Sequence, residues 1–189
     1  MYRTLKEIYQ ETQICQKCGL WETRNSVVFG EGSIRANIMM IGEGPGQVED
    51  ELGRPFVGPA GQLLSKMLES VDLKRDDIYI TNVVKCRPPK NRVPRPEECT
   101  ACLNYLRGQV ALIRPKIIVC LGKVAASAII SEDFKITKLR GTVYERKGFY
   151  IIPTFHPSAL LRDESKKKYA YEDFKKIAQL DKQLKMGQE

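Results

Sequence analysis

Two patterns of hydrophobic and polar positions alternate along the chain. One has the period of an amphipathic helix, and the other is the short apolar run of a buried strand. Apolar residues three and four positions apart, as in Leu63, Leu64, Met67 and Leu68, predict amphipathic helices. Short apolar runs that end at a glycine or a polar residue, such as the run that stops at Gly42, predict strands. The predicted helices cover residues 5–14, 62–71, 97–113, 123–130 and from about 169 onward, and the predicted strands cover residues 37–41, 78–84, 116–121, 142–144 and 149–154.

Strands that alternate with helices predict an α/β fold, with a mainly parallel sheet that helices cover on both faces. In such sheets, ligands bind beyond the carboxyl ends of the strands. Three loops rich in polar residues, glycine and proline lie at such ends, at residues 42–59, 82–96 and from 156 onward. We therefore expect one site at that rim of the sheet. The length of 189 residues fits a single domain over residues 1–189.

The charge balance bears on the kind of partner that the protein binds. The sequence has 31 lysines and arginines against 23 aspartates and glutamates, for a net charge of +8. A basic excess attracts nucleic acids because each neutralised phosphate releases counterions, although a solvated lysine-rich surface is the alternative. Much of the excess lies in residues 85–95 and 166–168. No apolar stretch reaches roughly 18 residues and the N-terminus has no apolar signal region, so we expect a cytoplasmic protein without membrane contact.

Six cysteines without an export signal are more typical of metal or cluster ligands than of disulfides. They are Cys15, Cys18, Cys86, Cys99, Cys102 and Cys120. The first two form a C-x2-C pair, and so do Cys99 and Cys102. Four thiolates hold either a cubane iron–sulfur cluster or a tetrahedral zinc ion, and the spacing alone does not choose between the two. It does not choose between Cys99 and Cys102 either, whereas Cys120 lies inside a predicted strand and is expected in the core.

Two of the loops at the predicted rim carry candidate chemistry. Residues 42–46 read Gly-Glu-Gly-Pro-Gly, in which glycines let the backbone approach a flat ligand and free amides cradle an anion or a carbonyl. A plain tight turn is the alternative. Phe56, in the same loop, either fills the local core or stacks on a base. His156 is the only histidine. A lone histidine is more often structural than catalytic, but its place directly after a predicted strand raises the odds of a role in the site.

Together, five separated segments closely resemble the family-4 uracil-DNA glycosylases, the iron–sulfur branch of the uracil glycosylase superfamily. The resemblance runs from Cys15 to about Arg162, which is most of the chain, and five segments in the right order make it specific. The segments are the cysteine pair at 15–18, Gly-Glu-Gly-Pro-Gly at 42–46, Gly-Arg-Pro-Phe-Val-Gly-Pro-Ala-Gly at 53–61, Thr-Asn-Val-Val-Lys-Cys-Arg-Pro-Pro at 81–89 and Pro-Thr-Phe-His-Pro-Ser at 153–158.

The resemblance implies a fold, a cofactor and an activity. The fold is a three-layer α/β/α sandwich with a central four-stranded parallel sheet, to which the sequence adds one short strand at 142–144. The activity is that of a uracil-DNA glycosylase, a hydrolase that flips uracil out of DNA and cleaves its N-glycosidic bond, which initiates base-excision repair. The cofactor is a 4Fe–4S cluster, and the cysteines that match its ligands are Cys15, Cys18, Cys86 and Cys102.

The same resemblance implies the residues that bind uracil. Phe56 stacks on the flipped base, and Asn82 reads its polar edge, because an amide offers both a donor and an acceptor. The backbone of the residues that follow the first predicted strand completes the pocket, and these residues are Gly42, Glu43 and Gly44.

The implied catalytic residues are His156 and Glu43. His156 donates a hydrogen bond to uracil O2, where negative charge grows as the glycosidic bond breaks. The aspartate that positions water in the best-known uracil glycosylases corresponds to Gly44, so Glu43 is the candidate that acts on the water or on the sugar's developing cation; a loop-fixing role is its alternative. The tyrosine that excludes thymine corresponds to Gly46, and Glu49 is the candidate that fills its space.

The implied contacts with DNA surround this pocket. Leu160, four residues after the histidine, corresponds to a wedge that fills the gap left by the flipped base, although simple packing is its alternative role. Phosphate contacts are expected from Arg162, Arg87, Lys90 and Arg92. We expect a monomer whose partner is DNA containing uracil, and no sequence feature supports contact with a replication clamp.

Three other functions remain open. One is a DNA-binding module of the same fold without turnover; the branch that captures abasic DNA covalently uses a histidine in a basic loop, which this sequence lacks. Another is a four-cysteine zinc protein with a nucleotide or RNA partner, which the pair Cys99 and Cys102 permits. The third is a glycosylase whose main substrate is another damaged base, such as hypoxanthine or a mismatched thymine.

Overall fold

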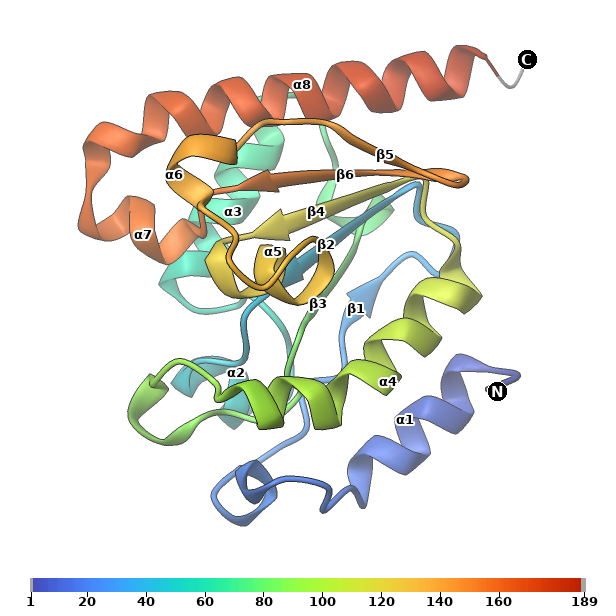
Figure 1. Ribbon diagram of the computed structural model, residues 1–189, viewed down its shortest axis with the longest axis vertical. Helices are drawn as coiled ribbons and strands as arrows, with labels where there is room; N and C mark the ends of the chain where they lie inside the picture. Colours follow the sequence, from blue (N-terminus) through green and yellow to red (C-terminus); the bar gives the residue numbers. More distant parts are fainter. Residues whose placement is uncertain (1, 188–189) are drawn as a thin grey trace.

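A six-stranded sheet forms the centre of the fold in the computed structural model, which describes residues 2–187 (Figure 1). Its strands are β1 (Glu31–Gly32), β2 (Ile38–Gly42), β3 (Tyr79–Asn82), β4 (Ile117–Leu121), β5 (Tyr144–Arg146) and β6 (Phe149–Thr154). They lie in the order β1-β3-β2-β4-β6-β5. Neighbouring strands from β3 to β6 are parallel, whereas β1 and β5 pair with the two outer members in the antiparallel direction.

The α/β class predicted from the sequence is confirmed, and the expected four-stranded sheet needs a correction, because the sheet has six strands. On one edge, β5 folds back on β6 through a turn at Lys147 and Gly148, where Gly148 adopts a φ of 87° that suits glycine. The strand predicted at 142–144 begins two residues later, at Tyr144. On the other edge, β1 has two residues, which are too few to give a hydrophobic period.

Eight α-helices occur among the described residues: α1 (Leu5–Gln13), α2 (Gln47–Leu52), α3 (Pro59–Glu69), α4 (Pro96–Ile113), α5 (Lys123–Ile129), α6 (Ile136–Leu139), α7 (Pro157–Arg162) and α8 (Lys167–Met186). Short 3-10 turns are η1 (Gly19–Glu22), η2 (Arg75–Asp77), η3 (Pro89–Asn91) and η4 (Glu164–Lys166). The five helices predicted from periodicity are α1, α3, α4, α5 and α8. The three that were not predicted have six residues or fewer, and two of them lie in loops at the rim of the sheet.

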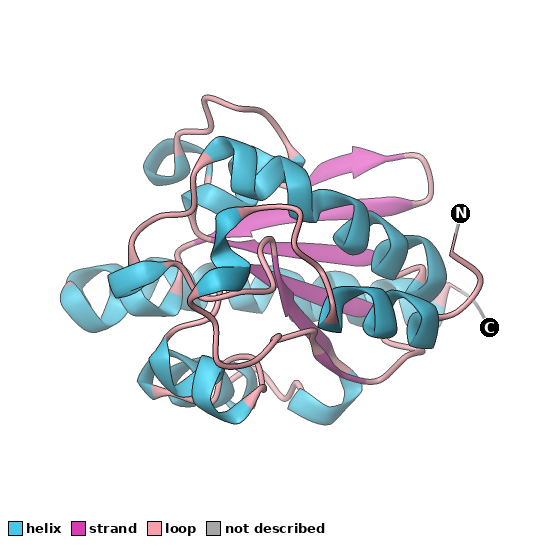
Figure 2. Ribbon diagram, turned by 90° about the horizontal axis from the view of Figure 1, so that it is seen from below, coloured by secondary structure: helices cyan, strands magenta, loops and turns pink. Residues whose placement is uncertain are grey.

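Helices pack on both faces of the sheet and make three layers (Figure 2). One face of the central strands packs against Leu106 of α4 and Ala125 of α5. The opposite face packs against Leu64 of α3 and Phe174 of α8. Every residue of β2, β3 and β4 is buried, as expected for strands covered on both sides. Among residues 2–187, no helix combines the length and the apolar character that crossing a bilayer requires.

The carboxyl ends of three parallel strands meet at one rim of the sheet. Gly42 ends β2 and pairs in register with Asn82, which ends β3. Thr154 ends β6, two residues before His156. The loops that the sequence predicted at this rim therefore lie together. Ligand sites of parallel sheets lie at this end of the strands.

Candidate active site and cysteine pocket

A cavity of about 520 Å³ opens at this rim, between the loops after β2, β3 and β6. Most of the residues expected to bind a base or a phosphate line it. They are Glu43, Gly44, Phe56, Asn82, Arg92, His156 and Arg162. Gly46, Glu49, Asn91 and Val93 also contribute to the wall, and sequence reasoning had assigned no role to the last two. The structure thus brings residues from three distant segments into one pocket.

Gly42 does not line the cavity but sits directly behind two of its walls. A methyl group at Gly42 would lie 2.5 Å from Cζ of Phe56 and 2.4 Å from Oδ1 of Asn82. Only glycine leaves room for both side chains at this position. The Oδ1 atom of Asn82 is buried and has no hydrogen-bond partner among the described residues. A buried acceptor without a partner is costly, so this oxygen is set up to accept a hydrogen bond from a ligand.

The geometry around His156 fixes its tautomer. His156 is the N-cap of α7, and its Nδ1 accepts the backbone N–H of Ser158 at 3.1 Å, with the Ser158 hydroxyl at 2.8 Å. Because a peptide N–H only donates, Nδ1 carries no proton, and the proton of the neutral ring is on Nε2. Burial, with a smaller effect from the Arg162 charge, lowers the pKa of His156 to about 4. The ring is therefore a neutral donor, and its centroid lies 5.6 Å from that of Phe56.

Glu43 is half-buried at the wall of the same cavity. Burial raises the pKa of its carboxyl group, and the positive charge of Arg162 opposes that shift. A carboxyl group with a raised pKa beside an open cavity is typical of functional sites. Arg162 itself is exposed at the cavity mouth, where it is available to a phosphate.

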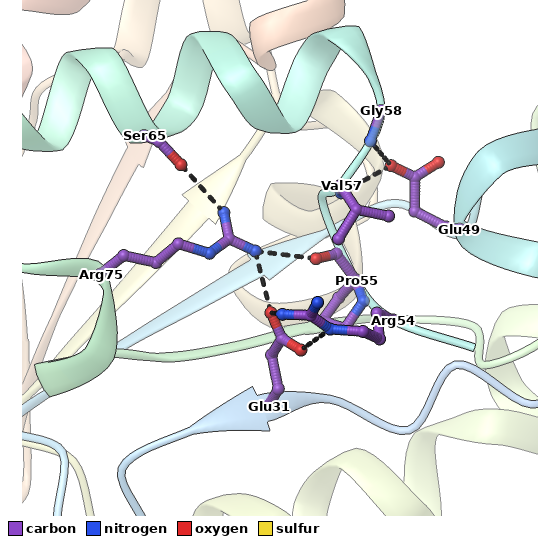
Figure 3. Close-up of polar contacts among 8 residues, drawn as sticks. All are labelled: Glu31, Glu49, Arg54, Pro55, Val57, Gly58, Ser65 and Arg75. Carbon is purple, nitrogen blue, oxygen red and sulfur yellow. Dashed lines mark hydrogen bonds and ion pairs between the residues drawn. The ribbon is translucent and has the colours of Figure 1, made fainter. Parts of the chain in front are cut away.

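Two side chains brace the loop that carries Phe56 (Figure 3). Glu49 accepts the backbone N–H groups of Val57 at 2.9 Å and Gly58 at 2.7 Å. Arg75 donates to the carbonyl oxygen of Pro55 at 2.8 Å. Glu49 had been the candidate for the space beside Gly46, and its carboxylate does lie there, since a methyl group on that glycine would be 2.7 Å from Oε2. The structure adds the loop-holding contacts, which the sequence did not show.

A second, smaller pocket contains four of the cysteines. Cys15 and Cys18 lie on the segment after α1, Cys86 follows β3, and Cys102 lies on α4. Cys99, one helical turn before Cys102, does not line this pocket, and Cys120 is buried in the core. Within residues 2–187, no three His, Cys, Asp or Glu side chains are grouped closely enough to hold a single metal ion.

Two cations lie beside these sulfurs. Arg24 donates to Sγ of Cys86 at 3.2 Å. Lys85 is 1% exposed, and its Nζ donates to Oγ1 of Thr81 at 2.5 Å, to the carbonyl oxygen of Asn82 at 2.9 Å and to Oε1 of Gln109 at 2.7 Å. These three acceptors are all uncharged, so the ammonium group has no carboxylate to balance it. A buried cation of this kind fits a neighbouring group of thiolates, and it opposes the increase that burial causes in the pKa of Cys102.

Part of the expected DNA-contact set is buried or already paired within the chain. Leu160 is fully buried against Phe155 and Ala170, in a cluster that α3 also covers, and this position does not fit a wedge that enters DNA. Arg92 lines the cavity, but its guanidinium group is bonded to the buried Glu98 at 2.6 and 2.8 Å. Lys85, at the start of the basic run at 85–95, points into the core.

Besides Arg162, two further members of that set, Arg87 and Lys90, are not buried in the core. Arg87 donates to Oδ1 of Asn91 at 2.7 Å, and Lys90 is exposed on the turn η3. Neither lines the cavity. Lys90 and Asn91 both have positive φ values, 54° and 55°, so the tip of this basic loop turns sharply.

A family model described as the uracil DNA glycosylase superfamily matches residues 29–178. The chain belongs to the uracil DNA glycosylase superfamily. The superfamily match spans every residue of the cavity wall together with Cys86 and Cys102, whereas Cys15 and Cys18 precede it.

Curated relatives refine this placement within the superfamily. The chain is 48% identical over 186 residues to the type-4 uracil-DNA glycosylase of Sulfurisphaera tokodaii, covering 94% of this chain and 84% of that protein. It is 46% identical to the type-4 uracil-DNA glycosylase of Archaeoglobus fulgidus, covering 94% of this chain and 93% of that protein. It is 48% identical to the type-4 uracil-DNA glycosylase of Thermotoga maritima, covering 85% of each chain. These relatives confirm the family resemblance that the five sequence segments carried.

Proposed function

We propose that this protein is a uracil-DNA glycosylase, which removes uracil from DNA by hydrolysing the N-glycosidic bond. The observation that carries the proposal is the buried Oδ1 of Asn82, an acceptor without a partner among the described residues, in the same cavity as a neutral histidine donor and a phenylalanine ring. Acceptor, donor and ring are what a flat base with both N–H and C=O groups requires. The names of the type-4 relatives agree with this assignment.

The pocket recognises uracil through complementary hydrogen bonds. The Asn82 amide accepts from the N3–H group of uracil through Oδ1 and donates to O4 through Nδ2. Cytosine carries no hydrogen at N3 and an amino group in place of O4, so the same amide would meet it with two mismatched pairs. Phe56 stacks on the base. Gly42, behind Phe56 and Asn82, has no side chain that would push either residue out of place. Flipping the nucleotide costs a few kcal/mol, which these contacts and phosphate contacts offset.

His156 stabilises the leaving group in this proposal. When the bond between uracil N1 and the sugar C1′ breaks, its electron pair stays on uracil and spreads onto O2. The Nε2–H group of His156 donates to that oxygen, and the contact strengthens as the charge grows. The oxygen of a water molecule forms the new bond to C1′ and releases a proton, which balances the proton that the departing uracil anion takes up at N1. The products are free uracil and an abasic site. Glu43 acts on the attacking water or on the positive charge that develops on the sugar.

The cysteine pocket fits a 4Fe–4S cluster held by Cys15, Cys18, Cys86 and Cys102. Such a cluster spreads its four thiolate ligands around a body of several atoms, whereas a zinc ion needs all four within about 2.3 Å of one centre. Two adjacent cations suit the negative charge of such a group. When bound, the cluster supplies no redox step to hydrolysis and serves as a structural link between the N-terminal segment, β3 and α4. The proposal also includes that the protein acts as a monomer in the cytoplasm and that its partner is DNA containing uracil.

The function is tested with a labelled oligonucleotide that carries a single uracil. We expect the purified protein to leave an alkali-sensitive abasic site at that position, in single-stranded or double-stranded DNA, and to release free uracil. Oligonucleotides with hypoxanthine, or with thymine opposite guanine, measure the breadth of the substrate range. Binding without release would indicate a DNA-binding module of the same fold, and release of another base alone would move the main substrate away from uracil.

The tautomer and burial of His156 predict an unusual pH dependence. Burial favours the neutral ring, so the folded-state pKa lies near 4, below the ordinary value of 6.5. We expect the rate of uracil release to show no inflection at pH 6.5, and expect the contribution of this group to stability to be complete above pH 6.5 and lost as the pH falls toward 4. His156 is the only histidine, so an NMR titration of imidazole signals measures it directly. A titration midpoint near pH 6.5 in the folded protein would contradict this account.

A further inference from the structure

Phe56 adopts a backbone conformation that the chain does not favour by itself. Its φ is 52°, in the left-handed region that is uncommon for bulky residues. The side chain is nevertheless 6% exposed, with its ring against His156 and above Gly42. Backbone strain of this kind persists only where the surroundings hold it in place. The structure must therefore contain groups that fix the two peptide units on either side of this residue.

Arg75 holds the peptide unit that precedes Phe56. It lies in η2, just before β3, and its Nη2 donates to the carbonyl oxygen of Pro55 at 2.8 Å (Figure 3). The same guanidinium group donates to Oε1 of Glu31 on β1 at 3.2 Å and to Oγ of Ser65 on α3 at 3.3 Å. One rigid, planar group thus ties the Phe56 loop to an edge strand and to a helix.

The remaining sides of the loop are also closed. The Glu49 carboxylate accepts the N–H group of Val57, in the peptide unit that follows Phe56. A methyl group at Gly61, in the first turn of α3, would lie 1.8 Å from the Phe56 carbonyl oxygen. The helix therefore limits movement of the loop toward α3, and Arg75 is the group that holds its N-terminal side.

We propose that Arg75 is a positioning residue of the base pocket, which acts through the Pro55 carbonyl to keep the Phe56 ring in its stacking position. Arg75 does not line the cavity, so it is not placed to touch a base bound there. The inference rests on the proposed function, because it assigns a residue to the recognition of the flipped base. Its side chain is 23% exposed, and its guanidinium group already donates to three acceptors, so little of it faces outward.

Arg54 provides a matched control. It pairs with the same Glu31 carboxylate, at 2.8 Å, but its side chain is 63% exposed and its hydrogen bonds reach only that carboxylate. An Arg54→Ala variant removes a cation from the same network without releasing the Phe56 loop. Arg75→Lys keeps a positive charge near Glu31, yet an ammonium group cannot span the three acceptors that the guanidinium group joins.

The experiment measures single-turnover uracil release at saturating enzyme, beside affinity for uracil-free DNA. We expect Arg75→Ala to slow release about tenfold, on the scale of one charge-assisted hydrogen bond, with unchanged affinity for uracil-free DNA. Arg75→Lys should lie close to Arg75→Ala, and Arg54→Ala close to the wild type. If Arg75 acts through Phe56, adding Arg75→Ala to Phe56→Ala should slow release no further.

Other outcomes would overturn the inference. Losses that multiply in the double variant would show that Arg75 acts independently of Phe56, and wild-type rates in Arg75→Ala would show that the loop holds without it. If Arg75→Ala does not fold, Arg75→Lys takes its place in the same comparison with Phe56→Ala. Uracil release by the wild type in the same assay tests the proposed function separately from the role of Arg75. If the wild type released no uracil, both the proposed function and this inference would be wrong.

Discussion

Replacing His156 with alanine is expected to slow uracil release roughly 100- to 1000-fold, the usual loss when one preorganised donor to a developing oxyanion is removed. The expectation follows from the tautomer, since Nδ1 is occupied by the N–H group of Ser158 and the only ring proton is on Nε2. The donor acts mainly in the transition state, so DNA affinity should change little. Single-turnover rates and binding to uncleavable DNA measure the two quantities separately.

Ser158→Ala is the matched control for that variant. It removes the hydroxyl group that lies 2.8 Å from Nδ1 but leaves the backbone N–H contact at 3.1 Å, so the tautomer is preserved. We expect a loss of about tenfold or less, the scale of one neutral hydrogen bond. If His156→Ala weakened DNA binding as much as it slowed release, the ring would be a binding group and leaving-group stabilisation would be the wrong account.

The second large effect is expected at the cysteine pocket. Replacing either of two cysteines on the same helix, α4, should give opposite results. Cys102→Ser should lose the brown colour and the bound iron of a 4Fe–4S protein and lower the melting temperature, because a bound metal group contributes several kcal/mol to folding. Cys99→Ser should keep all three, because Cys99 lies outside the pocket. Iron analysis, visible absorbance and thermal unfolding of anaerobically purified protein measure the difference.

The reverse result would reassign the ligands. Loss of colour in Cys99→Ser with colour retained in Cys102→Ser would place Cys99 in the set. A colourless wild-type protein with one bound zinc would show that the pocket holds a zinc ion and that the cluster proposal is wrong. Cys120→Ser is a further control, since this residue is buried in β4 and should affect packing without changing the iron content.

Periodicity predicted the core of this fold well, since residues 38–41 and 117–121 are apolar throughout, as expected for strands covered on both faces. Glycine and proline punctuation also located the loops that form the cavity. The short helices α2 and α7 were hidden because their sequences sit among residues that usually mark turns. Segments of six residues carry too little periodic signal to be recognised without their tertiary contacts.

Leu160, Lys85 and Arg75 have positions that the sequence did not show, and the shared physical reason is that sequence position does not reveal which way a side chain points. Leu160 and Leu161 are adjacent, but the packing of α7 buries the first and leaves the second 48% exposed. Lys85 belongs to a basic run in the sequence, yet it follows two buried valines and its own side chain is buried in the core. That flanking apolar pair was the only local sign of its burial. Arg75 gave no sign at all, because its partners come from segments 10 to 44 residues away.

The two edges of the sheet bear on how the protein behaves at high concentration. An exposed edge strand offers unpaired backbone groups to any other strand, and long, flat edges promote aggregation. Here β1 has two residues, and β5 has three, of which Glu145 and Arg146 are charged and exposed. Short, charged edges are a common protection against strand addition. The sheet thus gives a neighbouring molecule little to extend, so copies of the protein have little opportunity to associate by pairing their strands.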